Sequence, residues 1–164
     1  MRSYINKISE AVNRVSIAVS CVGIAVTAVS CFLQVFTRYI LNSSLSWTEE
    51  LCRYAAIVVY MFGFSIAVKR GSNPKIDLLS NLLKGRARTA HAVFCMAATC
   101  VCGLIIVCFG IQAMPMGRRS VSSVLHIPAS WMYLVIIVSQ LFCILHSLAG
   151  IVNDISELRM KKEG

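Results

Sequence analysis

The sequence predicts an all-α integral membrane protein with four transmembrane helices and a short amphipathic surface helix between the second and the third. Of its 164 residues, 57% are apolar and only 14% are charged, and the mean hydropathy is +0.73. Soluble domains usually hold about 45–50% apolar and about 25% charged residues, and a chain this short buries too little surface to hide such an excess. A water-soluble monomer, a disordered tail and a secreted disulfide scaffold are therefore disfavoured.

Stretches without Asp, Glu, Lys or Arg locate the predicted spans. The four longest are residues 15–37, 54–68, 89–117 and 120–153. A bilayer core of about 30 Å needs about 20 helical residues, so only the second stretch is short. It reaches 22 residues when counted from Trp47 to Val68, with the Arg53 side chain extended to the interface. We therefore predict one membrane domain, residues 1–164, with spans near 15–37, 47–68, 90–112 and 129–152.

The first span shares some features with a cleaved leader. Arg2, Lys7 and Arg14 precede it, and Ala-Val-Ser-Cys strings that end at Cys21 and Cys31 are a weak match to a lipoprotein processing site. Its apolar run, however, is longer than the core of about 7–15 residues that signal peptides carry, and no clear cleavage site follows it. We expect a retained helix.

The basic residues predict the orientation, because Lys and Arg near span ends concentrate on the cytoplasmic side. With the N-terminus inside, the inner segments hold twelve of the sixteen basic residues, and the outer segments hold Arg38, Arg53, Arg118 and Arg119. We therefore expect both termini in the cytoplasm and two loops outside. The net charge of +9 then reflects topology and attraction to anionic lipids, and nucleic-acid binding is not needed to explain it.

The inner loop between the second and third spans contains the predicted surface helix, at about residues 74–84. Asn73 is a suitable cap and Pro74 a suitable first helical residue. Apolar residues then line one face, as in helices that lie in the membrane surface, and a soluble connecting loop remains the alternative. The basic residues expected to contact lipid head groups are Lys69, Arg70, Lys75, Lys84, Arg86 and Arg88.

Apart from Glu49 and Glu50 at the outer end of the second span, the predicted spans lack the carboxylates that usually carry ions. No Asp or Glu falls inside a charge-free stretch, which disfavours both a stand-alone transporter and a small exporter. Neither outer loop contains a cysteine, so a four-helix redox protein that uses cysteine or haem, the main alternative, lacks an exposed reactive pair. Cys100-x-Cys102 has no complementary Cys or His pair for zinc. We expect no catalytic residue, bound cofactor or metal on this chain.

The first outer loop, residues 38–54, combines several local signals. Ser46 to Glu49 matches a capping box, with Ser46 capping the second span and Glu49 reaching back. Glu49 and Glu50 stand four and three residues before Arg53, so either can neutralise this guanidinium at the membrane edge. Arg38 ends the first span and is expected within reach of Glu50. The loop anchors the helices and, as an equally weighted alternative, also presents a docking surface.

This loop also carries a family resemblance. The residues that define it, in order, are Arg38-Tyr39, Asn42, Trp47, Glu49-Glu50, Arg53-Tyr54, Gly63, Lys69-Arg70-Gly71 and Ile76-Asp77-Leu78-Leu79, with a looser match at Ser123, Leu125, Ile127-Pro128 and Trp131-x-Tyr133. The series resembles the small, DctQ-like membrane subunit of tripartite ATP-independent periplasmic (TRAP) transporters. The resemblance covers about residues 30–80 and 120–135. The chain departs from it at Asn73-Pro74, where the family often has a His, and in the last span, which lacks the frequent central Pro and Gly.

The resemblance implies a sodium-coupled importer of an organic acid, such as a dicarboxylate or sialic acid, in the bacterial inner membrane. A large membrane subunit would carry substrate and sodium, a periplasmic binding protein would deliver the substrate, and this chain, which is no enzyme, would be a scaffold. The cluster expected at the subunit interface is Arg38, Tyr39, Asn42, Trp47, Glu49, Glu50, Arg53 and Tyr54. The residues expected to help dock the binding protein are Arg118, Arg119 and Trp131.

Overall fold

The computed structural model describes residues 2–42, 45–70 and 86–163, with the backbone alone for residues 2–4, 86, 88 and 155–163. In these ranges the chain forms the helices α1 (Arg2–Ile40), α2 (Ser46–Lys69), α4 (Arg86–Arg119) and α5 (Ser130–Glu163). All four are long and apolar enough to cross a membrane, so the predicted all-α class with four spans is confirmed. The predicted surface helix at 74–84 lies outside the described residues.

The helices extend beyond the spans predicted from the charge-free stretches. Helix α1 begins at Arg2, and α4 continues through Pro115 to Arg119 instead of ending near residue 112. A proline removes one backbone donor and crowds the preceding turn, but it stands only four residues before the end of α4. A charge-free stretch corresponds to the part of a helix inside the hydrocarbon core of the bilayer, whereas the helical backbone continues into the polar region on either side.

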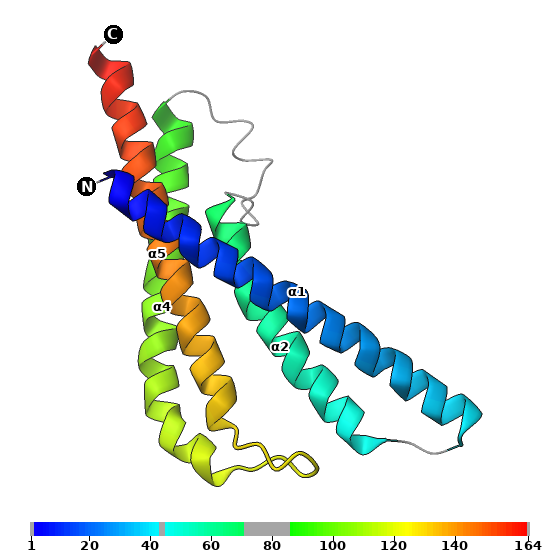
Figure 1. Cartoon of the computed structure of the whole chain (residues 1–164). Coiled ribbons are helices and arrows are strands. Elements are labelled where there is room, and N and C mark those ends of the chain that lie inside the picture. Colours follow the sequence, from blue (N-terminus) through cyan, green and yellow to red (C-terminus); the bar gives the residue numbers. More distant parts are fainter. Residues whose placement is uncertain (1, 43–44, 71–85, 164) are drawn as a thin grey trace.

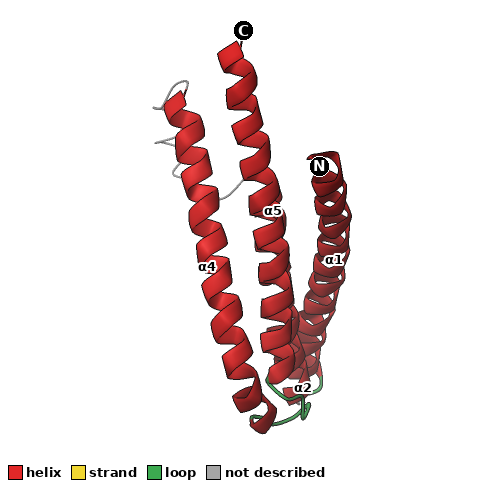
Figure 2. Ribbon diagram, turned by 90° about the vertical axis from the view of Figure 1, so that its left-hand side faces the viewer, coloured by secondary structure: helices red, strands yellow, loops and turns green. Residues whose placement is uncertain are grey.

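The four helices form two antiparallel hairpins, α1–α2 and α4–α5 (Figure 1). Helix α5 is central, because it packs against α4, α2 and α1. Both chain termini lie at one end of the bundle, which we call the terminal end (Figures 1 and 2). The opposite end, where residues 38–42, 45–50 and 118–131 gather, is called the loop end.

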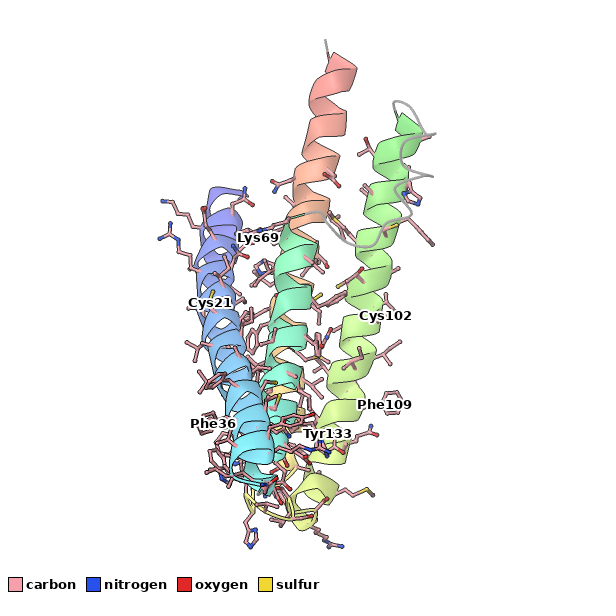
Figure 3. The ribbon with its side chains drawn as sticks, turned by 90° about the vertical axis from the view of Figure 1, so that its right-hand side faces the viewer. Cys21, Phe36, Lys69, Cys102, Phe109 and Tyr133 are labelled. Atoms are coloured by element: carbon pink, nitrogen blue, oxygen red, sulfur yellow. The ribbon has the colours of Figure 1, made fainter. Side chains whose placement is uncertain are left out.

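Burial in this bundle is the reverse of that in a soluble protein. The fully buried side chains include Ser16, Ser65, Ser139 and Ser147, whereas large apolar side chains cover the outside. Phe109, for example, is 67% exposed and points away from the bundle (Figure 3). In a bilayer the lipid is as apolar as leucine, so helices associate through close packing and hydrogen bonds between small and polar residues. The burial pattern therefore agrees with a membrane environment.

The contact between α4 and α5 depends on a glycine seam, Gly103, Gly110 and Gly117, at seven-residue intervals along α4. A Cβ atom at Gly103 or Gly110 would lie 3.0 Å from the Cγ1 atom of Ile144 or Ile137, respectively. At Gly117 it would lie 2.6 Å from the Tyr133 ring and 2.9 Å from the backbone nitrogen of Ser130. Seven residues are about two helical turns, so the three glycines share one face and allow α5 to approach closely.

Candidate functional site at the loop end

The second loop, residues 120–129, is a short antiparallel hairpin. The Ala129 N–H donates to the Ser120 carbonyl at 2.9 Å, and the Ser122 N–H donates to the Ile127 carbonyl at 3.0 Å. His126 has a φ of 54°, a left-handed conformation that closes the tight turn. Figure 1 shows this loop, in yellow, reaching from the α4–α5 hairpin toward the loop end of α2.

The carboxylate of Glu50, in the second turn of α2, joins the two hairpins. Its Oε2 accepts hydrogen bonds from the Ser122 hydroxyl and from the Leu125 N–H at 2.9 Å, and its Oε1 accepts one from the Val124 N–H at 3.2 Å. Backbone amides of a tight turn form a favourable site for an anion, and hydrogen bonds to a charged acceptor are stronger than neutral ones. We call this set of contacts the Glu50 clamp.

The Glu50 clamp replaces the ion pairs that the sequence predicts. In the part of the chain that the structure describes, no ion pair joins Arg38, Glu49, Glu50 or Arg53, and Arg38, Glu49 and Arg53 are exposed. The predicted pairing of Glu50 with Arg53 is therefore wrong. The turn at residues 122–125 offers three fixed donors, whereas an exposed Arg–Glu pair gains little over separate hydration because two long side chains must be ordered.

The predicted capping box is also absent. Helix α2 begins at Ser46, and its N-cap is Leu45, whose side chain makes no capping hydrogen bond. Instead, the buried Thr48 hydroxyl donates to the Leu45 carbonyl at 2.7 Å. The helix starts one residue earlier than the capping box requires, so Ser46 and Glu49 are both displaced from the positions of the reciprocal hydrogen bonds.

The remaining predicted cluster residues lie around the clamp without contacting Glu50. Tyr39 is 76% exposed and Trp47 is also exposed, while Tyr54 is half-buried. Asn42 follows α1 with a φ of 48°, and asparagine tolerates this left-handed conformation at a helix end better than most residues. Two of the eight predicted residues thus have a definable structural role, Asn42 as the stop of α1 and Glu50 as the clamp.

The residues predicted to dock a binding protein also lie at the loop end. Arg118 and Arg119 end α4 and are exposed, and Trp131, the second residue of α5, is 58% exposed. Of the predicted lipid contacts, Lys69 and Arg70 lie toward the terminal end, where Arg70 is exposed and Lys69 is half-buried. Lys75 and Lys84 fall outside the described residues, as do the side chains of Arg86 and Arg88.

Two polar contacts at the terminal end have no signature in the sequence. The Ser9 hydroxyl lies 2.8 Å from Nδ1 of the buried His146, and the side-chain amides of Asn6 and Asn153 meet at 3.3 and 3.5 Å. Both contacts join α1 to α5 across more than 130 residues of sequence. Single polar residues in apolar segments commonly bond across helices, but the sequence alone does not say which of them meet.

The cysteines and histidines form no metal site in the part of the chain that the structure describes. No group of three His, Cys, Asp or Glu side chains there is arranged to hold a metal ion, and all eight cysteines are free. The Cys31 thiol on α1 and the Cys52 thiol on α2 meet between the helices, with sulfur atoms 3.4 Å apart.

Comparison with known proteins decides the family. The model of the family described as "Tripartite ATP-independent periplasmic transporters, DctQ component" matches residues 27–157. The chain belongs to this DctQ family. It is a TRAP-transporter small permease subunit and a multi-pass membrane protein, as the resemblance of the first loop predicts. The matched range contains the cluster predicted at the subunit interface and the Glu50 clamp. The comparison does not favour the alternative of a four-helix redox protein.

Two curated relatives within TRAP transporters are similar in sequence to this DctQ-family chain. It is 30% identical over 120 residues to the sialic acid TRAP transporter small permease protein SiaQ of Vibrio cholerae, covering 73% of this chain and 69% of SiaQ. It is 28% identical over 100 residues to the sialic acid TRAP transporter permease protein SiaT of Haemophilus influenzae, covering 61% of this chain and 16% of SiaT. The chain thus matches about a sixth of the longer relative.

Proposed function

We propose that this chain is the small membrane subunit of a sodium-coupled importer of an organic acid, with sialic acid as the first candidate. In this proposal it pairs with a large membrane subunit and receives substrate from a periplasmic binding protein. The observation that carries the proposal is its similarity both to a separate small permease and to one segment of a much longer permease. A unit that occurs alone and inside a longer chain is expected to work beside the rest of that chain.

The role of this chain is that of a scaffold. The stretches 15–37, 54–68, 89–117 and 120–153 contain no Asp, Glu, Lys or Arg, whereas proteins that couple ions to transport usually hold ionisable groups within the membrane. Sodium and substrate are therefore assigned to the large subunit, and this chain holds no cofactor. The Glu50 clamp fixes the two hairpins relative to each other, as a rigid support for a moving partner requires.

The orientation that fits this role has both termini in the cytoplasm and the loop end in the periplasm. The excess of basic residues in the inner segments supports it. The loop end then presents exposed guanidinium groups of Arg38, Arg53, Arg118 and Arg119 to the periplasm. Such a cationic surface attracts an acidic patch on the binding protein and accelerates their encounter.

Co-purification tests the pairing. The chain, tagged at its C-terminus, is co-expressed with a TRAP large subunit from the same genome and purified in mild detergent. We expect the two to elute together in equal amounts after size-exclusion chromatography. Elution of the tagged chain without the large subunit, in several detergents and in nanodiscs, would contradict the proposal.

Docking is tested separately, with variants that leave the membrane pair intact. Arg118→Ala combined with Arg119→Ala should weaken binding of the periplasmic protein and reduce its dependence on salt, because two screened charges are lost. Arg70→Ala, an exposed arginine at the terminal end, is the matched control and should have no effect. Equal behaviour of the two variants would remove the loop end as the docking surface.

A further inference from the structure

A polar cavity of about 230 Å³ lies between α1, α2 and α5 at the terminal end of the bundle. It is lined by Asn6, Ser9, Glu10, Lys69, His146, Ala149 and Asn153. Lys69 ends α2 beside α1, as Figure 3 shows. The cavity is distinct from the Glu50 clamp, which lies at the opposite end of the bundle, and it has no part in the function proposed above.

One side chain in the wall has an unused hydrogen-bonding group. His146 is 3% exposed, and its Nδ1 is engaged by the Ser9 hydroxyl. Its other ring nitrogen, Nε2, is buried and has no partner among the described residues. A buried polar atom without a partner costs free energy, and native structures leave few of them. The His146 ring is therefore a candidate to bind a polar group in the cavity.

The cavity also presents two opposite charges, Lys69 and the exposed Glu10, which attract each other without approaching to salt-bridge distance. Lys69 and Glu10 both line it, and no ion pair joins them in the part of the chain covered by the structure. A ligand with a single charge would satisfy one of them and be repelled by the other. A zwitterionic ligand, whose anionic and cationic groups are a few bonds apart, satisfies both.

The position of the cavity along the bilayer normal indicates which ligand it meets. Its residues lie at the ends of the apolar helical segments, which begin at Ile5 and end at Lys69 and Asp154. Lipid head groups occupy this level of a bilayer. We propose that the cavity binds the phosphoethanolamine head group of a membrane phospholipid. The Lys69 ammonium and the His146 Nε2–H donate to its phosphate, and its primary ammonium donates to the Glu10 carboxylate.

The test compares two lipids that differ only in the methyl groups on nitrogen. The full-length chain, purified in detergent, is mixed with equal amounts of phosphatidylethanolamine and phosphatidylcholine with the same acyl chains, and retained lipid is measured by native mass spectrometry. We expect about tenfold preference for phosphatidylethanolamine, because the trimethylated nitrogen cannot donate the charge-assisted hydrogen bond to Glu10. Equal retention of both lipids would overturn the proposal.

Variants assign the preference to this cavity. Glu10→Gln should abolish the preference while lipid is still retained, and Lys69→Gln should lower the retention of both lipids. Arg70→Gln is the matched control, because Arg70 adjoins Lys69 but is exposed and does not line the cavity. If Arg70→Gln lowers retention as much as Lys69→Gln, the attraction is a general surface effect and the proposal fails. Should Lys69→Gln not fold, the Glu10→Gln comparison decides alone.

A last experiment distinguishes binding of the lipid from binding of free phosphate. The thermal unfolding temperature of the full chain is measured with phosphatidylethanolamine and with inorganic phosphate plus ethanolamine. We expect stabilisation by the lipid alone, since its acyl chains hold the head group at the depth of the cavity. Equal stabilisation by the two soluble components would identify a soluble ligand instead and overturn the proposal.

Discussion

The two hairpins of this DctQ-family protein pack in different ways. In the α4–α5 hairpin, the glycine seam brings the helices together so closely that added Cβ atoms at three positions would meet the facing helix at 3.0 Å or less. The α1–α2 contact is instead flanked by two apolar grooves of about 250 and 360 Å³. In lipid there is no hydrophobic driving force for helix association, so close packing requires small residues at the contact positions. The α4–α5 hairpin has such residues along its length, and the α1–α2 hairpin does not.

The largest effect is expected where the seam is tightest. In Gly117→Ala, the new methyl group would collide with the Tyr133 ring and with the backbone nitrogen of Ser130, which cannot move alone. We expect a loss of about 3 kcal/mol in the free energy of unfolding, at the upper end of the range for overpacking. Urea titration in mixed micelles, followed by circular dichroism, measures it.

Gly63→Ala is the matched control, because beyond the adjoining backbone of α2 no atom of the described residues lies within 4 Å of the position that its new methyl group would take. Alanine is a better helix former than glycine by about 1 kcal/mol, so this variant should be slightly more stable. Gly23→Ala on α1 is intermediate, since its closest contact is a single methyl group of Val59 at 2.7 Å. Equal losses at positions 117 and 23 would remove the distinction between the hairpins.

The next effect concerns the contact between the hairpins at the terminal end. Ser9→Ala removes the only hydrogen-bond partner that the described residues provide for the buried His146 ring. Leaving a buried polar group unsatisfied costs about 1–2 kcal/mol, and the same titration measures this loss. Ser16→Ala is the matched control, because among the described residues this buried hydroxyl donates only to the Val12 carbonyl of its own helix. Equal unfolding free energies for the two variants would mean that the Ser9–His146 contact does not hold α1 to α5.

A local effect is expected at the Glu50 clamp. Glu50→Ala should accelerate amide hydrogen exchange at Val124 and Leu125, whose N–H groups lose their acceptor, and leave the cores of the helices protected. Glu49→Ala, at an exposed neighbour, should change nothing. In double-mutant cycles, Glu50→Ala should couple with Ser122→Ala and be additive with Arg53→Ala. Coupling to Arg53 instead would restore the ion pair that the sequence predicts.

The smallest effect is expected in the grooves of the α1–α2 hairpin. Ala56→Val adds two methyl groups at a position that lines the smaller groove, where open space accepts them. The unfolding free energy should stay within about 0.5 kcal/mol of the wild type, as at a surface position. A loss comparable to that of Gly117→Ala would show that α1 and α2 are packed as tightly as α4 and α5.

The four-helix architecture is largely predictable from the sequence, because the length of a charge-free stretch follows directly from the thickness of the bilayer. The contacts between side chains are not predictable in this way. Glu50 binds backbone amides of a turn more than 70 residues away, and amides have no sequence signature, whereas Arg53 is three residues away and easy to notice. The start of α2 shows the same difficulty on a smaller scale, since a shift of one residue turns Ser46 from a cap into the first helical residue.

The glycine seam is a different case. Gly103, Gly110 and Gly117 are visible in the sequence at equal spacing, although neither the charge-free stretches nor the family resemblance draws attention to them. Their spacing predicts a shared face of one helix, but the partner that fills that face is known only from the structure. Asn42 is similar, because the residue type permits a left-handed conformation and only the fold requires it.

Reconstituted transport tests most directly whether this chain supports a transporter without carrying the solute itself. Proteoliposomes are prepared with the large subunit alone, with this chain alone and with both, and uptake of labelled sialic acid is measured with the binding protein and a sodium gradient. We expect uptake only when both subunits are present. Uptake by this chain alone, or full uptake by the large subunit without it, would contradict the scaffold role.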